Sequence, residues 1–235
     1  MNSKPFCKKI FFYFLILSGF SFWGCATVST LPKEKTVPIT GEAGRVGVFR
    51  KFPVQAAVLI PEGEKNYVYK ATPMVFQISN VVHVFPLGEA LEKDSIEIFS
   101  QIFRDVQIVR TPAEAQKFKI VIAPKIEEFR FAYEEGKGGY DIIRFILFKA
   151  TMKGKITVFR EGARIFEKSI TSPELKKTSP YQIGFTNEED MGEVAFQALN
   201  YTLKKLAEEM AQDPEVEKNA TSATIDGLKK AYAWR

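Results

Sequence analysis

The sequence predicts an α+β fold: a two-layer sandwich in which a mixed sheet with a long antiparallel hairpin carries two main helices on one face. The hairpin is predicted by two extended runs, 140–159 and 163–171, that are separated by the turn signal Glu161-Gly162. The helices are predicted by two segments, 87–102 and 186–213, with apolar residues at three- and four-residue steps. Strands and helices alternate early, whereas the hairpin is antiparallel, and this order favours helices that cover one face.

The first half of the folded part begins at Val54. A short apolar run is bounded by Pro61 and Gly63, as buried strands often are. Further strand-like pieces follow, separated by Pro73 and Asn80, and the helix comes after Pro86. In order, the sequence predicts strands at 54–60, 67–69, 75–78 and 81–85, a helix from 87 and a strand at 106–109.

A short helix is predicted next, because Thr111 can cap it, Pro112 suits its first position and Glu114 can reach back to the cap. A longer strand, 118–131, contains Pro124, which lacks a backbone donor and suggests an edge or a bulge. The glycines that follow predict a turn over 134–139.

The last helix has the clearest signal in the chain. Thr186 and Glu189 form a capping box, apolar residues recur at helical spacing, and Asp213-Pro214 ends the helix. The segment that precedes it, 173–185, is interpreted as a polar connection.

The N-terminus has the pattern of a bacterial secretory signal. Lys4, Lys8 and Lys9 give a positive start, and a nearly unbroken apolar run then leads to Gly24-Cys25. This run is shorter than the roughly 20 residues that a membrane-spanning helix needs. We therefore expect a segment that is removed; an uncleaved anchor and an ordinary secretory signal are the alternatives.

Cys25 is predicted to be the lipid attachment site. Phe22-Trp23-Gly24-Cys25 resembles the lipobox of bacterial lipoproteins, in which the thiol receives a diacylglyceryl group; Gly24 fits that pattern, and Phe22 and Trp23 depart from it. Within such lipoproteins the residue after the Cys influences sorting, and Ala26 favours the outer membrane. We expect a palmitate-type anchor and a domain that faces the periplasm.

These features divide the chain into four parts. They are a lipoprotein signal peptide (1–24), a lipidated Cys with a flexible tether (25–53), a single α+β domain (54–213) and a polar C-terminal tail (214–235). As a flexible coil the tether would reach roughly 30 Å. An edge strand within it, at 46–49, is the alternative.

The residue composition limits the functions that this chain can have. The net charge of +5 falls to +2 without the three signal lysines, which argues against a nucleic-acid binder. Cys7 would leave with the signal and Cys25 would carry lipid, so a disulfide, a cysteine nucleophile and a cysteine zinc site are excluded. The single histidine, His83, has apolar neighbours and is interpreted as structural. No catalytic residue, metal site or cofactor is predicted.

One surface feature points to a partner. From 142 to 148 both faces of the predicted strand are apolar except at Arg144, so the outward side chains of Ile143, Phe145 and Leu147 need a cover. That cover is another part of this chain, a partner protein or a lipid-like ligand.

The lipobox, the tether, the strand and helix over 88–109, the strand at 119–129, and the hairpin and capped helix over 145–206 together resemble the small α/β bacterial outer-membrane lipoproteins. The lipopolysaccharide-assembly and transport-auxiliary lipoproteins are examples. The resemblance implies a non-catalytic, membrane-anchored protein that binds envelope partners in assembly or transport. A lipid- or glycolipid-binding module is the alternative, and an envelope hydrolase is the third, which would need His83 or a carboxylate pair.

Overall fold

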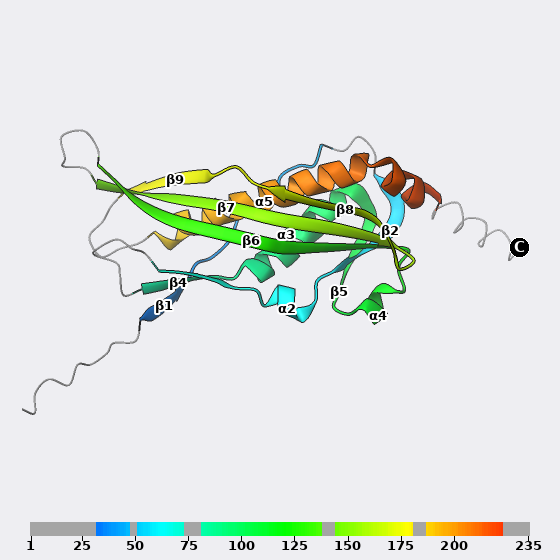
Figure 1. Cartoon of the computed structure of the whole chain (residues 1–235), viewed down its shortest axis with the longest axis horizontal. Coiled ribbons are helices and arrows are strands. Elements are labelled where there is room, and N and C mark those ends of the chain that lie inside the picture. Colours follow the sequence, from blue (N-terminus) through cyan, green and yellow to red (C-terminus); the bar gives the residue numbers. More distant parts are fainter. Residues whose placement is uncertain (1–31, 48–50, 73–80, 138–143, 181–186, 223–235) are drawn as a thin grey trace, which may run out of the picture. The chain divides into compact units, whose positions relative to one another are not determined.

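The structure is a computed structural model that describes residues 32–47, 51–72, 81–137, 144–180 and 187–222. The chain divides into two compact units, residues 1–33 and 34–235, and the second unit holds the fold. It is the predicted α+β arrangement, with two sheets and with the two long helices on one face of the larger sheet (Figure 1).

The larger sheet is mixed and has the order β5-β2-β6-β7-β8, with β9 paired to β7. β2, β5 and the start of β6 are parallel, whereas β6, β7, β8 and β9 pair antiparallel. The strands are β2 (Phe52–Leu59), β5 (Phe103–Val109), β6 (Ile120–Lys137), β7 (Arg144–Arg160), β8 (Ala163–Thr171) and β9 (Leu175–Pro180).

The smaller sheet has the order β1-β4-β3, made of β1 (Lys33–Thr36), β4 (Val81–Phe85) and β3 (Tyr69–Ala71). Its Phe85 and Tyr69 pack against Phe129 and Phe131 of β6, with ring centroids 4.6 to 5.9 Å apart. Aromatic pairs at such distances add to the energy of burial. This cluster joins the two sheets.

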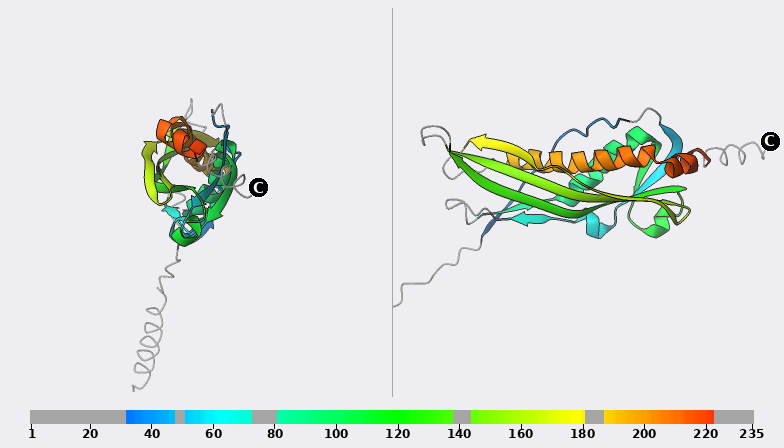
Figure 2. Two further views of the ribbon diagram at one scale, coloured as in Figure 1. Left: turned by 90° about the vertical axis from the view of Figure 1, so that its right-hand side faces the viewer. Right: turned by 45° about the horizontal axis from the view of Figure 1, so that its top comes forward.

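Helices α3 (Leu87–Ile102) and α5 (Glu188–Gln212) cover the inner face of the larger sheet (Figure 2). The inward residues of β7 that meet them are buried, from Ile146 and Phe148 to Ile156 and Val158. The alternation predicted for this strand is confirmed. Two short helices, α2 (Glu62–Lys65) and α4 (Pro112–Ala115), lie in connections between strands.

The predicted turns and caps are confirmed at two positions. Glu161 and Gly162 have φ angles of 49° and 86°, the positive values that a tight two-residue hairpin requires. Thr111 caps α4, and its hydroxyl oxygen accepts from the backbone N–H of Glu114 at 3.3 Å.

Three local predictions are wrong. The segment 173–185, interpreted as a connection, contains β9, an edge strand too polar to show alternation. The turn at 134–139 starts later, because β6 runs to Lys137. The cap of α5 is Asn187, whose side chain accepts from the backbone N–H of Asp190 at 3.4 Å; Thr186, like the strand piece at 75–78, lies outside the described residues.

Residues 37–47, which belong to the predicted tether, lie against α3 and α5; we call them the strap. Val37 is fully buried, and backbone N–H groups of the strap donate to side chains of both helices. Those of Ala43 and Val46 donate to Glu97 and Gln101 of α3, and those of Gly44 and Gly47 to Asn200 and Glu208 of α5. This part of the chain is therefore fastened to the domain.

Beneath the strap lies a buried carboxylate, Asp94 of α3. The side-chain amide of Asn200 donates to both of its oxygens, at 3.1 and 3.3 Å, while the amide oxygen accepts from Gly44. Burial raises the pKa of Asp94 to about 6. The contact between α3 and α5 thus contains a group that titrates near neutral pH.

After Asp213 the chain forms a further helix over residues 214–222. Val216 and Ala220 are fully buried in it, and the Arg160 guanidinium donates to Asn219 and to Ser222. The described part of the predicted polar tail therefore packs on the end of β7.

Candidate functional site

The predicted lipid site, Cys25, and the first residue of the predicted partner patch, Ile143, lie outside the described residues. The other two patch residues, Phe145 and Leu147, are half-buried on the outer face of β7, the face opposite α3 and α5. The patch as a partner site stays a prediction.

Phe145 obtains part of its cover from its own sheet. It pairs with Gly136 of β6, and its ring lies where a side chain on Gly136 would have to be. Leu147 lies between Glu134 of β6 and Thr178 of β9, both exposed. A glycine on the neighbouring strand therefore lets the aromatic ring lie flat on the sheet.

His83 lies on β4 and is fully buried. Its Nδ1 is 2.8 Å from the Tyr133 hydroxyl, and its Nε2 is 4.0 Å from a carboxylate oxygen of Glu188, which also pairs with Lys35 at 2.8 Å. Burial lowers the pKa of His83 and raises that of Tyr133, so both side chains are neutral at pH 7. This geometry fits the structural role predicted for the histidine.

The strongest candidate for a binding site is a hollow on the outer face, beside α4. β2 lies between β5 and β6 in the sheet, and both of these strands are parallel to β2. The connection from β5 to β6 must therefore cross over β2. That connection contains α4, and it passes over Ala57 and Leu59. A second, smaller apolar cluster forms there, apart from the main core; its buried members are Ala57, Val109, Ala115 and Val121.

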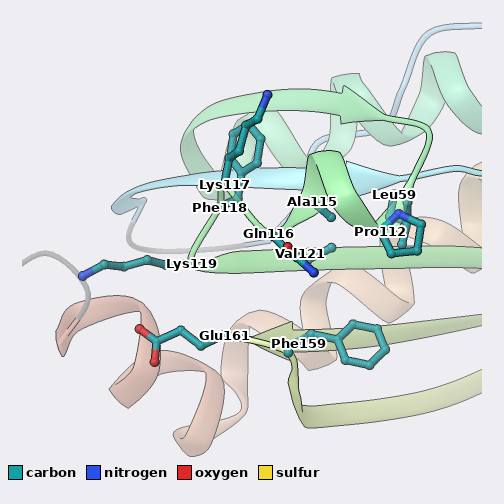
Figure 3. A pocket seen from close by; sticks show the side chains of 11 residues that line it. Leu59, Pro112, Ala115, Gln116, Lys117, Phe118, Lys119, Val121, Phe159 and Glu161 are labelled. Atoms are coloured by element: carbon teal, nitrogen blue, oxygen red, sulfur yellow. The ribbon is translucent and has the colours of Figure 1, made fainter.

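The hollow has a volume of about 690 Å³, within the range of small-molecule sites. Figure 3 shows α4 and the turn after it on one side, Val121 on the floor and Phe159 on the other side. The apolar lining residues are Leu59, Pro112, Ala115, Phe118, Val121 and Phe159.

Charged groups lie only at the rim of this hollow. Lys117 and Lys119 come from the turn after α4, and Glu161 comes from the hairpin; Figure 3 shows these side chains directed away from the apolar floor. The backbone N–H of Glu161 donates to the carbonyl of Lys119 at 3.3 Å, which ties the two sides together at one end. The arrangement offers an apolar interior with charged side chains at its rim.

A smaller hollow of about 350 Å³ continues along the same face and shares Leu59 with the first. Its lysines are already paired, Lys125 with Glu64 at 3.2 Å and Lys155 with Glu167 at 3.0 Å. The larger hollow therefore has the stronger apolar character.

Within the residues that the structure describes, no group of three or more His, Cys, Asp and Glu side chains is placed to hold a metal ion. Among the same residues, no helix has both the length and the apolar character to cross a membrane.

Sequence reasoning did not find the hollow. Its signals were present: a predicted helix start at Thr111-Pro112, and an apolar Phe159 that follows a run of polar residues, 149–157, at the outward positions of its strand. The sequence has no signal for the crossover that places α4 over β2, because the crossover follows from the order of the strands in the sheet.

No protein-family model matches the chain, and no curated protein matches it. Three solved structures are similar in trace. A Xanthomonas campestris protein of family DUF330 has a TM-score of 0.45 and 13% identity, with 84% of this chain and 99% of that chain covered. A neuraminyllactose-binding hemagglutinin homolog from Helicobacter pylori has a TM-score of 0.43 and 11% identity, with coverage of 79% and 97%.

The third, a minor lipoprotein from Acinetobacter baumannii, has a TM-score of 0.29 and 12% identity, with 73% of this chain and 94% of that chain covered. No functional residue of this chain follows from likenesses of this degree.

Proposed function

We propose that this protein is an envelope lipoprotein, anchored in the outer membrane through a lipid on Cys25, whose domain faces the periplasm and acts by binding. The observation that carries the proposal is the positively charged, apolar N-terminal segment that ends at Gly24-Cys25. A thiol at that position is the acceptor for a diacylglyceryl group.

Binding is favoured over catalysis by how the reactive side chains are used. His83, the single histidine in the sequence, is buried beside Tyr133 and Glu188 and does not reach either outer-face hollow. The adjacent carboxylates Glu127 and Glu128 are engaged by Lys153 and Arg130, at 3.0 and 2.6 Å. These contacts give the side chains structural roles.

The strap gives the anchor a defined point of attachment. The described chain after the anchor first meets the domain at β1, which pairs with β4 of the smaller sheet, and residues 37–47 then run along α3 and α5. The outer face, with the hollow and the Phe145 patch, then stays clear of this connection and is the surface that we assign to a partner in envelope assembly or transport.

Metabolic labelling with palmitate tests the anchor. The wild-type protein should incorporate label and fractionate with outer membranes, whereas Cys25→Ser should do neither. Equal labelling of wild type and Cys25→Ser would refute the anchor.

Detergent purification followed by mass spectrometry of co-purifying proteins tests the binding role. Phe145→Glu should reduce recovery of a partner that uses the outer face. Recovery of the wild-type protein only as a lone monomer would refute the binding role.

A further inference from the structure

We propose that the hollow beside α4 binds the hydrocarbon chain of a long-chain fatty acid, with the carboxylate of the ligand at the rim near Lys117. The proposal rests on the proposed membrane anchor in one respect, because the anchor places the hollow near a source of such chains. Its other supports are the shape, lining and charge of the site.

The lining fits a hydrocarbon chain. Val121 of β6, on the floor, pairs with Phe159 of β7 on one side and with Ala57 of β2 on the other, and Leu59 lies two residues beyond Ala57, so apolar side chains continue across three strands. Ala115, at the end of α4, and Phe118 close one side of the hollow, and Pro112, at the start of α4, closes one end. Each CH₂ group moved from water onto such a surface should strengthen binding about fourfold.

The volume fits one chain of this kind. At about 690 Å³ the hollow lies in the middle of the range for drug-sized ligands, and it opens on one side of the sheet only. The floor is one apolar strip, and the hollow that continues from it is lined by ion-paired lysines. A ligand with a single chain therefore fits better than one with two.

The rim favours an anionic head group. Three charged residues, Lys117, Lys119 and Glu161, line the hollow at its mouth. Lys117 is exposed, and no carboxylate of the described residues lies within ion-pair distance of it, whereas Lys125 and Lys155 are paired. The carboxylate of a bound ligand could therefore form an ion pair with the Lys117 ammonium group.

The test places a photoreactive residue, p-benzoylphenylalanine, at Gln116, which is exposed and lines the hollow. The full-length lipoprotein is reconstituted in phosphatidylcholine vesicles containing oleate, irradiated, digested and analysed by mass spectrometry. We expect an oleate adduct at position 116 that saturates with oleate. The same residue at Thr178, which is exposed on the outer face near Phe145, should give no saturable adduct.

Two substitutions on one strand face form the matched pair. Phe159→Asp should lower the adduct at least tenfold, and Phe145→Asp should leave it unchanged. Lys117→Glu should lower it about threefold, and hexadecyltrimethylammonium should compete less well than palmitate. If Phe159→Asp unfolds the protein, Gln116→Trp, with the photoreactive residue moved to Phe118, obstructs the hollow without altering a fully buried side chain and should likewise lower the adduct.

The identity of the adduct decides the outcome. A cross-link to residues 223–235, a cross-linked dimer, or an adduct with the mass of phosphatidylcholine would each overturn the proposal. The N-terminal peptide from the same digest reports lipidation of Cys25 separately. A missing lipid would therefore refute the anchor alone, and a missing oleate adduct on a lipidated protein would refute the fatty-acid site alone.

Discussion

The two faces of the larger sheet are covered in different ways. On the inner face, α5 covers β7 while α3 packs on β2 and β5, and Phe148 is fully buried. On the outer face, Phe145 lies flat over Gly136 at one end, and Phe159 stands beside the α4 hollow at the other. Side chains of one strand thus serve the core on one side and an accessible surface on the other. The inner face holds the main core, and the outer face is the surface that we propose for a ligand or partner.

The largest effect is expected on the inner face. Phe148→Ala should reduce the free energy of unfolding by about 4 kcal/mol, because it removes a fully buried ring that packs on Phe131 and Tyr133. Urea denaturation measures this loss. Phe145→Ala on the opposite face is the matched control and should cost about 1 kcal/mol. Equal losses would contradict the distinction between the faces.

A pH series sharpens the comparison at the contact between α3 and α5. The pKa of Asp94 rises from 3.8 to about 6 on burial, so the folded protein holds this proton more tightly than the unfolded chain does. Its contribution is most favourable below pH 4 and is lost as the pH rises through 6. Asp94→Asn should therefore be more stable than wild type by about 2 kcal/mol at pH 8 and should show no gain at pH 4. A gain that does not change with pH would contradict the assignment to Asp94.

The strap is tested by Gly192→Ala. Alanine alone would favour the helix by up to about 1 kcal/mol, but its Cβ would overlap the carbonyl of Pro38 in the strap. We expect a net loss of about 1 to 2 kcal/mol and faster tryptic cleavage after Arg45. Gly63→Ala, in α2 with no atom within 4 Å of the added Cβ, is the control and should not lose stability. Unchanged cleavage after Arg45 would show that the strap is not held there.

The smallest effect is expected at the hollow. Phe159→Ala should cost about 1 kcal/mol, since the ring is half-buried and belongs to the smaller apolar cluster. Thermal unfolding measures it. A loss as large as that of Phe148→Ala would mean that Phe159 belongs to the core, and the hollow would then be a packing feature without access for a ligand.

Local signals predicted most of the fold. Glu161-Gly162 sets the hairpin through its backbone angles, Thr111 caps α4, and the apolar spacing of 87–102 sets α3. The sequence did not predict what the bulge between Ile126 and Glu128 does. The bulge shifts the inward-facing positions of β6 from even to odd residue numbers, so Phe129, Phe131 and Tyr133 face the core.

The remaining features depend on contacts distant in sequence. β9 is a polar edge strand, and it is specified by pairing with β7 more than by its own residues. The strap has no periodicity, and it is held by Asn200 and Gln101 from two helices. The hollow exists because α4 crosses β2. A single sequence carries no direct signal for such arrangements, so the candidate binding site became visible only in the structure.

The most direct test of this account is the mass of the N-terminal peptide of the protein purified from its native membrane. We expect a peptide that begins at Cys25 and carries a diacylglyceryl group, with either a further acyl chain or a free amine at its N-terminus. A peptide that begins at Met1, or an unmodified Cys25, would contradict it.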